Sequence, residues 1–137
     1  MQLARRVAHE VVATGLSNEV EYIHALGVER VSDSSDVVTG KANMELQMRT
    51  TYANAAKVLA RFGAGLEHVV EEVLYVTDMD AAFAVAGAVR KSAYRSDTPQ
   101  CASTIAQVTR LAFPQQLVEI RFTPCIAGMS RGYAALR

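Results

Sequence analysis

Glu119 and Arg121 are the charged residues of this chain whose spacing most clearly suggests a site. They stand two residues apart in Leu117–Cys125, where the apolar residues Val118, Ile120 and Phe122 occupy the alternate positions. Successive side chains of a β-strand point to opposite faces of the sheet. The pattern therefore predicts a strand with one face on the core and with Glu119 and Arg121 side by side on the other face, which is open to solvent or lies at a polar interface.

Other reactive side chains lack the arrangement that their chemistry requires. Cys101 and Cys125 have no activating base evident in the sequence, and His9, His24 and His68 show neither metal-ligand spacing nor a nucleophile motif. Gly63 and Gly65 are not followed by Lys-Ser/Thr, so a phosphate-binding loop is not indicated. The sequence therefore predicts no metal site, and both cysteines are interpreted as small apolar residues.

Composition sets outer limits on structure and function. The chain has 137 residues, enough for one domain with a real core, and 50% of them are hydrophobic. Its 14 basic and 14 acidic side chains leave no net charge, which argues against nucleic-acid binding. No apolar run approaches the roughly 20 residues that span a membrane. Because the N-terminus also lacks a signal-peptide pattern, we expect a cytoplasmic protein with two reduced thiols and no membrane partner.

The first half of the chain predicts one long helix after an ambiguous beginning. Met1–Val31 is hard to assign, and Val20–Leu26 is compatible with either a strand or a helical turn. Ser32–Asp36 has the composition of a turn. Asn43 is the expected N-cap of a helix that ends near Gly63. Its apolar stripe comprises Met44, Met48, Thr51/Tyr52, Ala55, Val58/Leu59 and Phe62.

The second half repeats the order of a strand followed by a helix. Val69–Thr77 is rich in β-branched and aromatic residues, as buried strands are, and Asp78 then caps a helix. Asp80 in the first turn of that helix and Arg90, Lys91 and Arg95 towards its far end match the helix dipole. We expect Phe83, Ala86 and Val89/Arg90 on its inner face. Ala102–Leu111 and Gln116–Ile126 follow as two strands, joined through Phe113–Pro114.

This order predicts an α/β (α+β) fold, a two-layer sandwich with two helices on one face of a mixed β-sheet. We expect a single domain over residues 1–127 and a flexible C-terminal tail over residues 128–137. A sheet covered on one side only favours self-association over its open face.

Taken in order, these segments resemble the YjgF/Rid family of small enamine/imine deaminases. The resemblance covers roughly the last two thirds of the chain. It depends on Gln47, Asn54, Gly63, Leu66, Val69–Phe83, Ala102–Leu111 and the LVEI strand Leu117–Ile120. Each piece is generic, whereas the ordered set with these spacings is much more specific.

The resemblance implies a chorismate-mutase-like homotrimer with its sites in clefts between subunits. Deaminases of the family hydrolyse a reactive enamine or imine to a 2-keto acid and ammonia, and they need no cofactor because the substrate is already activated. An arginine in a Pro-Ala-Arg-Ser/Thr motif binds the substrate carboxylate, and a glutamate or a bound water handles protons.

This chain departs from the family pattern at both positions. When Val108–Leu111 is aligned, Ser103 takes the place of the family arginine, and Arg121 takes the place of the family glutamate. We therefore predict Arg121, Glu119 and Ser103 as catalytic residues. In this hypothesis Arg121 supplies the lost carboxylate anchor and Ser103 positions a water in the same cleft. The predicted substrate-binding residues are Tyr22, His24, Gly27, Cys101 and Thr104.

Structural alternatives stay open for these residues. Arg121 could simply pair with Glu119 at a trimer interface, and Ser103 could be only a small strand residue. For the whole chain, the favoured function is a hydrolase that deaminates a small enamine, imine or 2-amino-dienoate. A non-catalytic trimer that binds small carboxylate metabolites is the alternative, and an interaction module or ribonuclease is the third; zero net charge argues against a ribonuclease.

Overall fold

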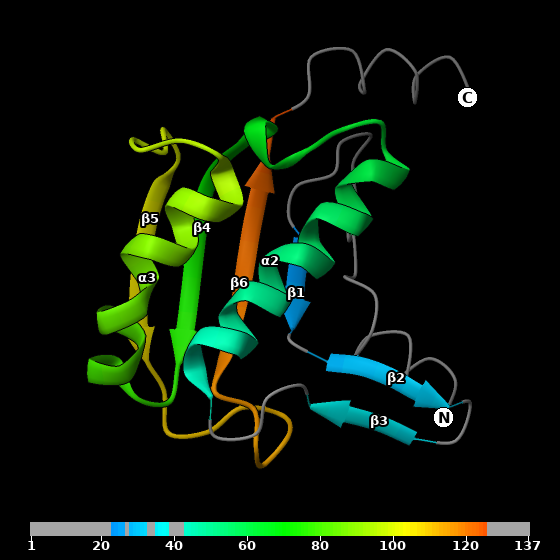
Figure 1. Ribbon diagram of the computed structural model, residues 1–137, viewed down its shortest axis with the longest axis vertical. Helices are drawn as coiled ribbons and strands as arrows, with labels where there is room; N and C mark the ends of the chain where they lie inside the picture. The colour runs from blue at the N-terminus through cyan, green and yellow to red at the C-terminus, as the bar shows by residue number, and fades with distance from the viewer. Residues whose placement is uncertain (1–22, 27, 33–34, 39–42, 126–137) are drawn as a thin grey trace.

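The structure, a computed structural model, describes residues 23–26, 28–32, 35–38 and 43–125. Two helices pack on the same face of a mixed sheet, which gives the predicted two-layer sandwich (Figure 1). The elements in chain order are β1 (Ile23–Leu26), β2 (Val28–Ser32), β3 (Ser35–Val38), α2 (Met44–Arg61), η1 (Leu66–His68), β4 (Val69–Val76), α3 (Met79–Tyr94), β5 (Ala102–Gln107) and β6 (Val118–Pro124).

Helix α2 begins and ends where the sequence predicts. The Asn43 Oδ1 accepts a hydrogen bond from the Leu46 backbone N–H at 3.0 Å, which satisfies one of the free N–H groups of the first turn. Gly63 follows the helix with φ of 70°, a left-handed conformation that glycine adopts without steric cost. The predicted stripe is buried from Met44 to Leu59, whereas Phe62 lies outside the helix and is partly exposed.

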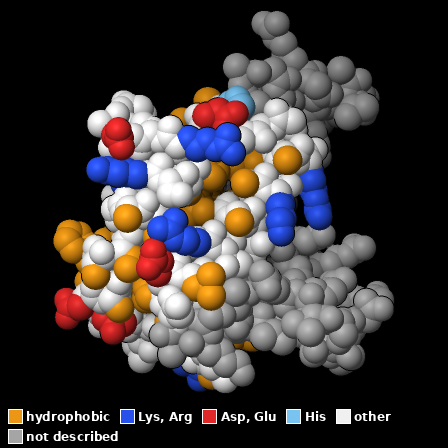
Figure 2. Space-filling model, viewed as in Figure 1, with side chains coloured by type: hydrophobic (Ala, Val, Ile, Leu, Met, Phe, Trp, Pro, Cys, Tyr) orange, Lys and Arg blue, Asp and Glu red, His pale blue; other side chains and the backbone are white. Residues whose placement is uncertain are grey.

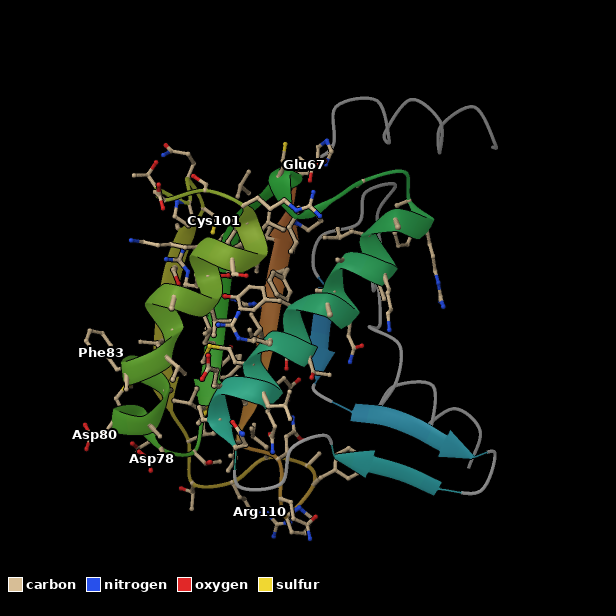
Figure 3. All side chains as sticks on the ribbon, in the orientation of Figure 1. Glu67, Asp78, Asp80, Phe83, Cys101 and Arg110 are labelled. Atoms are coloured by element: carbon tan, nitrogen blue, oxygen red, sulfur yellow. The ribbon has the colours of Figure 1, made fainter. Side chains whose placement is uncertain are left out.

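Helix α3 has the predicted cap, but its inner face was predicted wrongly at one position. Asp78 accepts from the Ala81 N–H at 3.0 Å. Phe83, expected on the inner face, is 75% exposed and points away from the molecule (Figure 3), and Ala82 is buried in its place. Val89 is buried, as expected. The helix is Ala-rich on several sides, so its apolar pattern does not determine how it is rotated about its axis.

The main sheet has four strands in the order β1-β6-β4-β5. Strand β4 pairs parallel with β5 and antiparallel with β6, and helix α3 connects the two parallel strands. Val118, Ile120 and Phe122 of β6 are fully buried, while Glu119 and Arg121 are half-buried on the other face. The predicted alternation of β6 is therefore confirmed. We call the face that carries Glu119 and Arg121 the open face, because the described helices lie on the other face.

The two layers are held together by an apolar core and by one buried amide. Gln47 of α2 is fully buried, and its Nε2 donates to the Gln115 carbonyl at 2.9 Å. Its Oε1 accepts from the Leu117 N–H at 2.8 Å. A side-chain amide thus satisfies the backbone just before β6 and fixes where this strand lies under α2.

The ambiguous beginning of the chain contains strands where the structure describes it. The part of Val20–Leu26 that is described is strand β1. Of the expected turn at Ser32–Asp36, Ser32 ends strand β2, while Ser35 and Asp36 begin the antiparallel strand β3. Residues 33–34 lie outside the described residues. Tyr22, Gly27 and the tail at residues 128–137 lie outside the described residues. None of the helices that the structure describes is both long and apolar enough to cross a membrane.

Candidate functional site

The register of the sheet brings several predicted site residues into one row. Arg121 of β6 pairs with His24 of β1 on one side and with Val73 of β4 on the other. Val73 in turn pairs with Thr104 of β5. Residues paired across neighbouring strands share a face of the sheet. The positions His24, Arg121, Val73 and Thr104 therefore form a row across the open face.

Arg121 has the properties of an available cation. Its side chain is 37% exposed, and its Nη2 lies 3.7 Å from the Glu71 Oε1, which is itself 48% exposed. An ion pair at this distance and exposure holds the guanidinium only weakly. Glu119 lies one pleat further along β6 on the same face, next to Tyr75 of β4 in register. The open face thus combines a loosely held arginine with two carboxylates.

Ser103 and Cys101, two other predicted site residues, do not join this row. Ser103 pairs in register with Glu72, whose side chain lies on the helix side of β4, and its Oγ donates to the Glu72 Oε1 at 2.8 Å. Cys101, just before β5 and near the end of α3 (Figure 3), accepts from the Arg90 Nη2 at 3.4 Å. The expectation that Ser103 and Arg121 face one cleft is therefore not met within a single chain, because they lie on opposite faces of the sheet.

The buried centre on the helix side is Glu72, which the sequence reasoning missed. Its side chain is fully buried and forms an ion pair with Arg90 of α3. Its Oε2 accepts from the hydroxyls of Tyr52 at 2.8 Å and Tyr94 at 2.5 Å, while Ser103 donates to its Oε1. Four donors from α2, α3 and β5 therefore converge on one carboxylate of β4. We call these five residues the Glu72 cluster.

Burial and the carboxylate together set the protonation states in the Glu72 cluster. Burial, and then the charge and hydrogen bond of Glu72, raise the pKa of both Tyr52 and Tyr94 well above the ordinary value. Burial opposes the Arg90 charge, but attraction to Glu72 outweighs it and raises the pKa of Arg90 overall. The cluster therefore keeps both phenols neutral and the arginine charged. Its position between helices and sheet, with every described donor engaged, indicates a structural role.

This protonation pattern predicts a loss of stability at alkaline pH. Above about pH 10 the unfolded chain releases the protons of Tyr52 and Tyr94 while the folded chain retains them, so the free energy of unfolding falls as pH rises. Each tyrosine contributes up to about 1.4 kcal/mol per pH unit. In urea unfolding between pH 10 and 11, Tyr52→Phe should show a shallower fall than the wild type. Tyr94→Phe should likewise show a shallower fall than the wild type, and a wild-type slope in both variants would contradict the prediction.

No group of three or more His, Cys, Asp or Glu suited to a metal ion occurs in the described ranges. The chemistry on the open face is instead that of an arginine and carboxylates. Such a set can bind an anion and move protons to or from water.

Comparison with known proteins identifies the fold and the family. The sequence model of the family described as Endoribonuclease L-PSP matches residues 18–126. Among solved structures, Rv2704 of Mycobacterium tuberculosis, a member of the YjgF/YER057c/UK114 family, has 22% identity and a TM-score of 0.62, covering 92% of this chain and 93% of that one. RidA of the Antarctic bacterium Psychrobacter has 20% identity and a TM-score of 0.62, covering 85% and 86%.

A third structure contains a small ligand. TdcF of E. coli with bound serine has 16% identity and a TM-score of 0.60, covering 86% of this chain and 87% of that one. No curated protein sequence matches the chain with significant similarity. The family match spans most of the chain, and the solved structures share its arrangement of two helices on a mixed sheet. The chain therefore belongs to the YjgF/Rid family, the family described as Endoribonuclease L-PSP.

Proposed function

We propose that this protein is a cofactor-independent hydrolase that deaminates a small reactive enamine, imine or 2-amino-dienoate. The single observation that carries the proposal is the position of Arg121, half-exposed on the open face in one row with Thr104. A guanidinium in this setting can bind a substrate carboxylate through two parallel hydrogen bonds. Family membership and the serine bound to TdcF, a molecule with a carboxylate and an amine, support the same substrate class.

The reaction needs few groups because the substrate carries its own reactivity. Protonation of the enamine carbon gives an imine, water adds to the C=N carbon, and the resulting carbinolamine expels ammonia to leave the keto acid. In our proposal Arg121 holds the carboxylate, the Thr104 hydroxyl hydrogen-bonds the substrate, and Glu119 accepts the proton of the attacking water. Ser103 has no part in this scheme, because its hydroxyl donates to Glu72 on the other face.

The proposed site is completed by a second subunit. The open face carries the partly exposed residues Val73, Tyr75 and Ala106 beside its charged groups. An apolar sheet face that no described element covers favours association with another copy of the chain. We propose a cytoplasmic homotrimer in which the open faces meet and the substrate lies in the clefts between subunits.

A direct assay tests the proposal. Short-lived enamines are generated in the cuvette from several amino acids, and keto-acid formation is followed with and without the protein, whose assembly is checked by light scattering. A rate that increases in proportion to the protein concentration is expected. An intact trimer that accelerates no substrate would contradict the enzyme and favour the alternative, a non-catalytic trimer that binds small carboxylates. This alternative is favoured by Ser103 and Arg121, which stand where the resemblance to the family leads us to expect an arginine and a glutamate.

A further inference from the structure

A groove between helices α2 and α3 has the composition of a second binding site. It is an open depression with a volume of about 360 Å³ and lies on the helix side of the sheet, away from the face that carries Arg121. Figure 2 shows apolar side chains at the bottom of a hollow in this face, with basic side chains around it and acidic side chains beside some of these. This volume is at the small end of the range for ligand pockets.

The floor of the groove is apolar and aromatic. Tyr52, Leu66 and Val89 line it and are all buried, with Tyr52 and Val89 almost completely so. The Tyr52 hydroxyl donates to Glu72 below the floor, so Tyr52 adds no free hydroxyl to the groove. The floor can therefore accept a flat apolar group.

The walls are shaped by alanines on both helices. Ala53 and Ala56 of α2 and Ala93 of α3 line the groove and are too short to close it. Protein interiors normally pack without such gaps, and larger apolar side chains at these positions would bury more surface. The open space thus depends on three small side chains at facing positions.

The mouth of the groove is basic. Arg49 of α2 and Arg95, the residue that ends α3, are both exposed and line it from opposite helices, and no acidic residue is among the described residues that line it. Arg49 also bonds Glu45 at 2.9 Å, one turn away along α2. Among the described residues Arg95 makes no ion pair, so its charge is available at the groove.

Arg95 is also held in an unusual conformation. Its φ and ψ of 53° and 42° are left-handed, and the Ser96 N–H bonds the Lys91 carbonyl at 3.1 Å, which is the pattern of a helix end that glycine normally occupies. A residue with a side chain is strained there, and such strain concentrates at functional positions. The strained backbone places an arginine immediately after the helix, beside the groove.

We infer that the α2–α3 groove binds a small aromatic carboxylate, with its ring between the alanine walls and its carboxylate between Arg49 and Arg95. The inference goes beyond the proposed function and does not depend on it, because the two sites lie on opposite faces of the sheet. Because none of the described acidic residues lines the groove, the two arginines favour an anion. The apolar floor and walls favour an anion with an aromatic ring over a small inorganic anion such as phosphate.

Titration of protein labelled at its alanine methyl groups tests the inference. Benzoate is the probe, benzamide is the neutral compound of the same shape, and inorganic phosphate is the anion without a ring. Benzoate should shift the signals of Ala53, Ala56 and Ala93 with saturation. Benzamide and phosphate should each bind at least about tenfold more weakly, because each lacks one of the two recognised features.

Two variants and a control locate the binding. Arg95→Gly removes the guanidinium and suits the left-handed backbone, so the protein should fold at least as well while benzoate binds at least about tenfold more weakly. Ala53→Leu should fill the groove and abolish the shifts. Lys57→Ala, an exposed change on α2 outside the groove, should leave the affinity unchanged. Absence of saturation, or an unchanged affinity in both Arg95→Gly and Ala53→Leu, would overturn the inference.

Discussion

Replacing Arg90 by methionine is expected to lower the free energy of unfolding by roughly 3–5 kcal/mol, the loss typical of a broken buried ion pair. The Glu72 side chain has no exposure, and Arg90 is the cation that the structure places against it. Methionine preserves much of the volume of the arginine stem but leaves the carboxylate buried without its counter-charge. The midpoint of urea unfolding measures the effect, provided that the slope of the free energy of unfolding against urea concentration is unchanged.

Two further variants separate charge from packing. Lys91→Met, at the exposed neighbouring position of α3, should change stability by no more than about 0.5 kcal/mol. Adding Glu72→Gln to Arg90→Met should restore part of the loss, since the amide oxygen still accepts from a tyrosine hydroxyl and no unpaired charge remains. If Arg90→Met is as stable as Lys91→Met, the Glu72 cluster does not stabilise the fold as we describe.

The caps and the strand alternation could be predicted from sequence because their causes are local. Asn43 and Asp78 bond N–H groups three residues away, so the chain segment alone contains the information. The two faces of β6 follow in the same way from alternation within seven residues. Phe83 was misplaced because α3 is apolar on several sides, and its rotation depends on contacts with other elements. Among these is the bond from Arg90 to Glu72.

The Glu72 cluster could be predicted only in part. Glu72 stands two and four residues before Leu74 and Val76, which are buried on the helix side of β4, and this spacing is a signal that a carboxylate is buried. Its partners are 18 to 31 residues away on three other elements, and only the tertiary packing of both helices brings them together. The separation of Ser103 from Arg121 likewise depends on the register of β4 with β5 and β6, which no local pattern determines.

The open-face site predicts a large loss of activity when Arg121 is replaced. Arg121→Gln should lower kcat/KM for enamine hydrolysis roughly 10- to 150-fold, the equivalent of the 1.5–3 kcal/mol that a hydrogen bond to a charged group contributes. Arg121→Lys should retain part of the activity, because an ammonium keeps the charge but not the two parallel donors. Initial rates of keto-acid formation over a range of substrate concentrations measure both variants.

The neighbouring carboxylates provide matched controls on the same face. Glu71 lies 3.7 Å from the Arg121 guanidinium, so a binding role for Arg121 predicts that Glu71→Gln leaves kcat/KM unchanged or raises it by freeing the arginine. Glu119→Gln should instead lower kcat with little change in KM, as loss of a proton acceptor does. A structural pairing of Arg121 would give the opposite pattern: Arg121→Gln and Glu71→Gln would destabilise the assembly alike and would not alter kcat/KM per folded trimer.

A substrate in which an amide replaces the carboxylate adds a test that changes the substrate instead of the protein. The wild type and Arg121→Gln should hydrolyse this amide at similar rates, because it lacks the charge that Arg121 binds.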